Sequence, residues 1–128
     1  MIESVNKWLA LSLGGIIGTF SRYQLAAWVP SFAGTGFPYG TLAVNLSACL
    51  LVGFFDSLSM VRTALGPEAR LLLMTGFCGA YSTFSTLILE TSNLASDGEL
   101  LRAAANYIGS GVLGFLLFRL GAYLGTVI

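Results

Sequence analysis

The charged residues of this 128-residue chain are few, and long uncharged stretches separate them. No charge lies between Arg22 and Asp56, between Arg70 and Glu90, or between Arg102 and Arg119. Stretches of this order suit helices that cross a bilayer, each of which needs roughly 20 apolar residues. Charged residues make up only 9% of the chain, against about 25% in soluble domains. A lipid bilayer is therefore the expected solvent.

Hydropathy and turn composition divide the chain into four apolar spans, at 8–28, 39–61, 71–94 and 101–127. The connectors SFAGTGFP, RTALGPEAR and ASDGE have turn compositions and leave no room for a soluble domain. The apolar run that follows MIESVNK is too long and too glycine-rich for a cleaved signal peptide, and it is interpreted as the first span. Residues 1–128 are thus expected to form one all-α membrane unit.

The composition also excludes several function classes. The formal net charge is zero, so the chain has no basic face for nucleic acid. It contains no histidine, which excludes most zinc, haem and imidazole chemistry. Cys49 and Cys78 lie in apolar stretches without C-x-x-C spacing, a pattern that favours buried structural thiols over a disulfide or a metal pair.

Small residues recur one helical turn apart in the first and last spans, at Gly14 and Gly18 and at Gly121 and Gly125. In lipid, such positions allow the backbones of two helices to approach closely. Four short helices leave little protein around a pathway, so oligomerisation is expected. The lysine and arginine bias between the two membrane sides is weak, which leaves insertion in both orientations, and hence an antiparallel dimer, open.

The third span is interrupted by the stretch GFCGAYSTFSTL at 76–87. A helix break there frees carbonyl groups that can hold a small cation, and the helix that resumes presents backbone amides to an anion. Ser82, Ser85 and Thr86 add hydroxyl donors, and the ring edge of Phe84 is weakly electropositive. The alternative is a kink in which Ser and Thr side chains bond to carbonyls one turn earlier.

Polar residues also stand one turn apart in two other spans. Thr41 and Asn45 share one helical face of the second span, and Asn106 and Ser110 repeat this spacing in the last span, beside Tyr107. An unpaired polar group costs several kcal/mol in hydrocarbon, so these residues are candidates for an ion pathway. The alternative is that they bond only to neighbouring helices.

Three motifs in register resemble those of the small fluoride channels, the Fluc or CrcB-type family: GGIIGTFSRY at 14–23, YGTLAVN at 39–45 and GFCGAYSTFST at 76–86. The resemblance covers essentially the whole chain. It implies four transmembrane helices with a broken third helix, assembled as an antiparallel, dual-topology homodimer with two pores. It also implies passive fluoride export across the inner membrane of a bacterial cell.

The resemblance further implies which residues act. The fluoride pathway would be lined by Asn45, Phe84, Ser85, Thr86 and Tyr107, together with Ser110 on the last span, and Arg22 would lie near a vestibule. The four-residue spacing to Asn45 adds Thr41 as a further pathway candidate. The backbone carbonyls of Gly79 and Ser82 would hold a structural Na⁺ on the dimer axis. The chain departs from the family pattern at Leu87, where a second phenylalanine is usual.

Two other functions stay open at this point. A small multidrug exporter can also be a four-span antiparallel dimer, but it needs a membrane-embedded carboxylate for proton exchange, and the first span has none. An accessory subunit of a larger membrane complex is the other. Asp56 and Glu90 lie nearer the ends than the centres of their spans, which favours passive conduction over proton-coupled transport.

Overall fold

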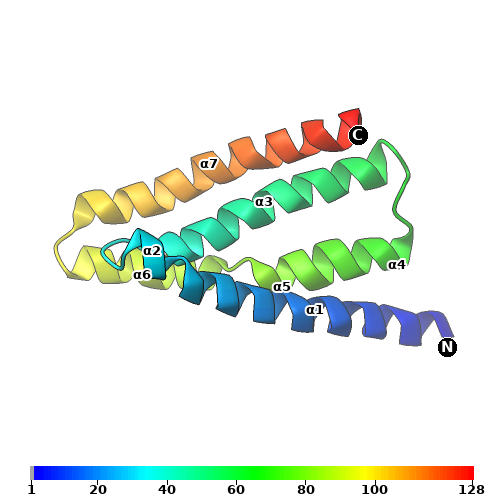
Figure 1. Cartoon of the computed structure of the whole chain (residues 1–128), viewed down its shortest axis with the longest axis horizontal. Helices are drawn as coiled ribbons and strands as arrows, with labels where there is room; N and C mark the ends of the chain where they lie inside the picture. Colours follow the sequence, from blue (N-terminus) through cyan, green and yellow to red (C-terminus); the bar gives the residue numbers. More distant parts are fainter. Residues whose placement is uncertain (1) are drawn as a thin grey trace.

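The computed structural model describes residues 2–128, which form a bundle of long helices without a strand in that range. Two long rods run in one direction, α1 and the segment from α4 to α6, and α3 and α7 run in the opposite direction (Figure 1). The elements in chain order are α1 Ile2–Trp28, α2 Pro30–Ala33, α3 Tyr39–Met60, α4 Pro67–Arg70, η1 Leu71–Cys78, α5 Gly79–Tyr81, α6 Phe84–Ser96 and α7 Leu100–Val127.

Three helical segments are long and apolar enough to cross a membrane: Tyr39–Met60, Pro67–Ser96 and Leu100–Val127. They correspond to the second, third and fourth predicted spans, and they identify the chain as an all-helical membrane protein. The third begins four residues before the expected position, because Pro67 is well suited to the first turn of a helix. Polar residues such as Arg22 and Gln24 interrupt the apolar run of α1, which is not among the three.

Glycines bring α3 and α7 into close backbone contact. A Cβ atom added at Gly53 would overlap the carbonyl oxygen of Phe118, and one added at Gly121 would overlap that of Leu50. Gly125 lies against Ser57 in the same way. Close van der Waals contact is what holds helices together in lipid, where the hydrophobic effect between them is absent. The predicted packing role of Gly121 and Gly125 is confirmed.

A second glycine contact joins α1 to η1, a stretch of π-helix that the sequence did not predict. Added Cβ atoms at Gly14 and Gly18 would overlap the backbone oxygens of Leu72 and Phe77, respectively. The wider π-helical turn is frequent near functional sites, and here it leads directly into the helix break. The close-packing role of Gly14 and Gly18 is also confirmed.

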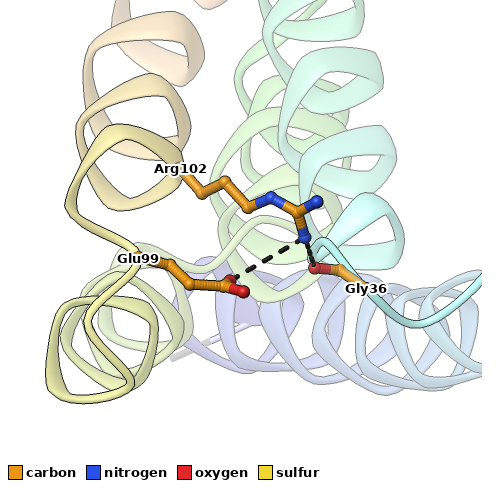
Figure 2. Close-up of polar contacts among 3 residues, drawn as sticks. All are labelled: Gly36, Glu99 and Arg102. Atoms are coloured by element: carbon orange, nitrogen blue, oxygen red, sulfur yellow. Dashed lines mark hydrogen bonds and ion pairs between the residues drawn. The ribbon is translucent and has the colours of Figure 1, made fainter.

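An arginine ties the α2–α3 loop to the start of α7, as Figure 2 shows. Nη1 of Arg102 donates a hydrogen bond of 2.8 Å to the carbonyl oxygen of Gly36, and it lies 3.8 Å from Oε2 of Glu99. This contact is exposed, so its ionic part contributes little free energy. Its effect is to position the loop at the end of the bundle where α6 gives way to α7.

Candidate functional site

The helical rod that starts at α4 is interrupted near its middle. α5 ends at Tyr81 and α6 begins at Phe84, while Ser82 and Thr83 take extended backbone conformations, with ψ angles of 160° and 111°. Gly79 stays helical, so the interruption is confined to the last two residues of the stretch GAYST in which it was expected. The hydroxyl oxygen of Thr83 caps α6 by accepting a 3.3 Å hydrogen bond from the amide of Thr86.

Asn45 of α3 forms hydrogen bonds to the interrupted segment through both the nitrogen and the oxygen of its side-chain amide. Its Nδ2 donates to the carbonyl oxygen of Thr83 at 3.0 Å, and its Oδ1 accepts from the amide of Thr83 at 2.8 Å. Two residues further along α3, the hydroxyl of Ser47 lies 2.7 Å from that of Tyr81. The amide and carbonyl of Thr83, which the break would leave unpaired, are therefore satisfied by a neighbouring helix. Asn45 was predicted as a pathway residue, and the structure gives it this second, structural task.

Part of the break is also satisfied locally. The carbonyl oxygen of Cys78 accepts two hydrogen bonds from Ser82, one from the amide at 3.0 Å and one from the hydroxyl at 2.9 Å. This is the back-bonding that the alternative interpretation proposed, and it coexists with the open break. The carbonyl oxygen of Ser82 itself accepts no hydrogen bond within residues 2–128.

The first turn of α6 presents donors on an exposed face. The amides of Phe84 and Ser85 are the first two of the helix, where no intrahelical partner exists and the helix dipole favours an anion. The side chain of Ser85 is exposed, and the residue Phe84 is 67% exposed. An aromatic ring, a hydroxyl and two backbone donors thus lie together on the outside of a single chain.

A groove of about 470 Å³, the Phe84 groove, gathers four of the predicted residues from three helices. It is lined by Asn45, Phe84, Tyr107 and Ser110, and Leu87 also borders it. Leu87 is buried, at 8% exposure, so the position of the missing second ring forms part of the groove wall. The hydroxyl of Ser110 is buried and has no hydrogen-bond partner in the described part of the chain.

A second groove, of about 440 Å³, lies between α1, α3 and the break, and we call it the Arg22 groove. Arg22, Thr41 and Thr86 line it, and Thr83 borders both this groove and the Phe84 groove. The predicted residues therefore divide into two sets that meet at the break. Ser85 lines neither groove.

Glu90 is a site residue that the sequence reasoning did not include. Its Oε1 accepts a 2.7 Å hydrogen bond from the hydroxyl of Thr41, and its Oε2 is buried without a partner in the described residues. A further groove, of about 420 Å³, is lined by Glu90, Thr41 and Thr86. The signal was present, because Glu90 stands four residues after Thr86 and shares its helical face.

Asn106 agrees with the alternative interpretation of the buried polar residues, in which they bond only to neighbouring helices. Its Nδ2 donates to the hydroxyl of Thr91 at 3.0 Å, and the residue is 1% exposed. It bonds α7 to α6 and does not line the Phe84 groove, although Tyr107 and Ser110 beside it do.

Residues 9–122 match the model of a protein family described as CrcB-like protein, Camphor Resistance (CrcB). The chain belongs to this family. Among curated relatives, the fluoride-specific ion channel FluC of Trichormus variabilis is 46% identical, over 97% of this chain and 91% of its own length. Proteins of the same name are 45% identical in Chlorobium phaeobacteroides strain BS1, over 99% and 98%, and 51% identical in Chlorobaculum tepidum, over 80% of each chain.

Proposed function

We propose that this CrcB-family chain is a fluoride-selective ion channel that exports cytoplasmic fluoride by passive conduction and so lowers fluoride toxicity. The observation that carries the proposal is the break at Ser82 and Thr83, where Asn45 and the donor-rich start of α6 lie between two grooves. The relatives named as fluoride-specific ion channels match the chain along most of its length and supply the identity of the ion. We place the protein in the inner membrane of a bacterial cell.

Fluoride is small and strongly hydrated, so a selective pore has to replace its water with closely spaced donors. The grooves offer uncharged donors: the hydroxyls of Thr86, Tyr107 and Ser110 and the Nδ2 of Asn45. Uncharged donors bind weakly and repeatedly, which lets an ion leave as well as enter. The ring of Phe84 can turn its electropositive edge toward the same path. Arg22, at the edge of the second groove, would attract anions to a vestibule.

A second copy of the chain would complete the pathway. One side of a conduction route is formed by three exposed residues, Phe84, Ser85 and Tyr107. Lipid hydrocarbon cannot form the opposite side of a route for an ion. We propose an antiparallel homodimer of subunits inserted in opposite orientations, each with four transmembrane helices, of which α1 is the first. The weak charge bias permits both orientations.

The same dimer would hold one structural Na⁺ between two breaks. The oxygen of Ser82 has no donor within residues 2–128, so it is free to bind a cation, and Gly79 lies three residues before it. No group of three His, Cys, Asp or Glu side chains within residues 2–128 is placed to bind a metal, and the proposal assigns backbone carbonyls as the ligands. Two carbonyls from each copy would give four. The ion would supply a fixed positive charge that links the subunits.

Fluoride efflux from liposomes tests the proposal. Purified protein in vesicles loaded with fluoride should release it down its gradient, at equal internal and external pH and without releasing chloride. Flux that requires a pH gradient would favour the proton-coupled exporter, for which Glu90, with its buried Oε2, offers a carboxylate. Absence of flux from the purified chain would favour an accessory subunit.

Two measurements test the assembly. Mass photometry of the purified protein should give twice the chain mass of 13.5 kDa. Replacement of Na⁺ by N-methylglucamine during reconstitution should reduce fluoride flux if the ion holds the subunits together, and unchanged flux and assembly would refute the sodium site.

A further inference from the structure

A small groove with charges of both signs lies between the C-terminal parts of α3 and α7, away from the helix break. Its volume is about 320 Å³, and we call it the Asp56 groove. Its lining includes Asp56, Ser57, Val61, Arg119, Tyr123 and Thr126. We propose that it binds the headgroup of a zwitterionic aminophospholipid, phosphatidylethanolamine.

The two charges of the groove stand on neighbouring, parallel helices and are not joined to each other. Within residues 2–128 the one ion pair closer than 4.0 Å is that of Arg102 with Glu99. An ionisable residue within a membrane helix is costly and usually has a partner or a function. Asp56 and Arg119 therefore each lack an ion-pair partner among the described residues.

The groove lies near the C-terminal ends of α3 and α7, where lipid headgroups are expected. Asp56 stands one turn before the end of α3 at Met60, and Arg119 stands two turns before the end of α7 at Val127. Tyr123, one turn after Arg119, is 63% exposed, and exposed aromatic side chains are typical of the membrane interface. A headgroup at this level can enter the groove from the side of the bundle.

A third polar group supports a ligand. Ser57 is 4% exposed, and its hydroxyl has no hydrogen-bond partner in the described residues although it borders the groove. Gly125 on α7 leaves room for it, because a Cβ atom added there would lie 2.7 Å from the Cβ of Ser57. The groove thus offers a guanidinium donor and a carboxylate acceptor, and the unpartnered hydroxyl of Ser57 is buried in its lining.

The combination of charges selects the ligand class. A simple anion would be repelled by Asp56, and a simple cation by Arg119, whereas a zwitterion satisfies both. A phosphate accepts bidentate hydrogen bonds from a guanidinium, and a primary ammonium donates to a carboxylate. Phosphatidylcholine has no N–H group to donate, and phosphatidylglycerol has no cation. Phosphatidylethanolamine alone of these three matches the whole groove.

Lipid retention by native mass spectrometry tests this assignment, independently of fluoride conduction. The purified protein would be incubated with phosphatidylethanolamine, phosphatidylcholine and phosphatidylglycerol of identical acyl chains. We expect about tenfold tighter binding of phosphatidylethanolamine, the effect of roughly one charge-assisted hydrogen bond. Equal retention of the three lipids by the unmodified protein would overturn the proposal without any variant.

Substitutions then locate the site. Arg119→Gln and Asp56→Asn should each reduce phosphatidylethanolamine retention to the level of phosphatidylcholine, whereas Arg119→Lys should keep part of the preference. Arg62→Gln is the matched control, because Arg62 follows α3 and does not line the groove. A preference that persists in both Arg119→Gln and Asp56→Asn would show that the lipid binds elsewhere and would refute the assignment.

Discussion

Replacement of Asn45 by leucine should destabilise the fold more than the loss of two ordinary hydrogen bonds between membrane helices. Such bonds average about 0.6 kcal/mol each, because the unfolded chain in the membrane also finds partners, which gives about 1.2 kcal/mol for the two bonds of Asn45. Here the partners are the backbone amide and carbonyl of Thr83, outside any helix. Leaving a buried backbone group unpaired costs about 1–3 kcal/mol, so leaving both the amide and the carbonyl of Thr83 unpaired should cost about 2–6 kcal/mol.

The free energy of unfolding can be measured by titration of the protein in mixed micelles with sodium dodecyl sulfate. Asn93→Leu is the control, because Asn93 is exposed on α6 and should change stability by no more than about 0.5 kcal/mol. Asn45→Leu should also lower fluoride flux, since the start of α6 loses its anchor. A stability loss below about 1.2 kcal/mol would refute the structural role of Asn45 at the break, because that value is expected of ordinary interhelical bonds.

Three further substitutions test the packing and the grooves. Gly14→Ala should destabilise the protein by about 1–3 kcal/mol, because the added methyl group would overlap the backbone of η1, whereas Gly15→Ala, with nothing within 4 Å, should be neutral or slightly stabilising in the same titration. Thr41→Val should cost about 1–3 kcal/mol and reduce flux, since it leaves Glu90 without its 2.7 Å donor, while Thr41→Ser should retain both properties. Leu87→Phe should increase fluoride flux by adding a ring edge to the Phe84 groove, and an unchanged rate would show that this position does not contact the ion.

Much of the architecture could be predicted from the sequence, because hydropathy reports directly on which segments can lie in lipid. The spans at 39–61, 71–94 and 101–127 agree with helical segments of the structure to within a few residues. The glycine pairs were identifiable for a similar reason, since a missing side chain at one-turn spacing leaves a flat surface on any helix. The π-helical stretch Leu71–Cys78 was not predicted, because its residues are ordinary apolar helix formers and nothing local demands a wider turn.

The candidate site was only partly predictable. The stretch 76–87 stands out in the sequence because hydroxyl residues and glycine are unusual at mid-span. The position of Glu90 near the end of a span gives no sign of its role, although its partner Thr41 is a candidate by its spacing to Asn45. Linear position along a span says how deep a residue lies, but it does not say which neighbouring side chain it meets.

The sequence alone predicted that this chain is helical, membrane-embedded and interrupted within residues 76–87, since charge spacing, hydropathy and local helix propensity are properties of short segments. Only the tertiary structure decided that Asn45 forms hydrogen bonds with Thr83, 38 residues away, and that Thr41 donates one to Glu90, 49 residues away. These pairings depend on the rotation and axial register of packed helices. Glycine contacts between backbones set that register, and no single segment encodes it.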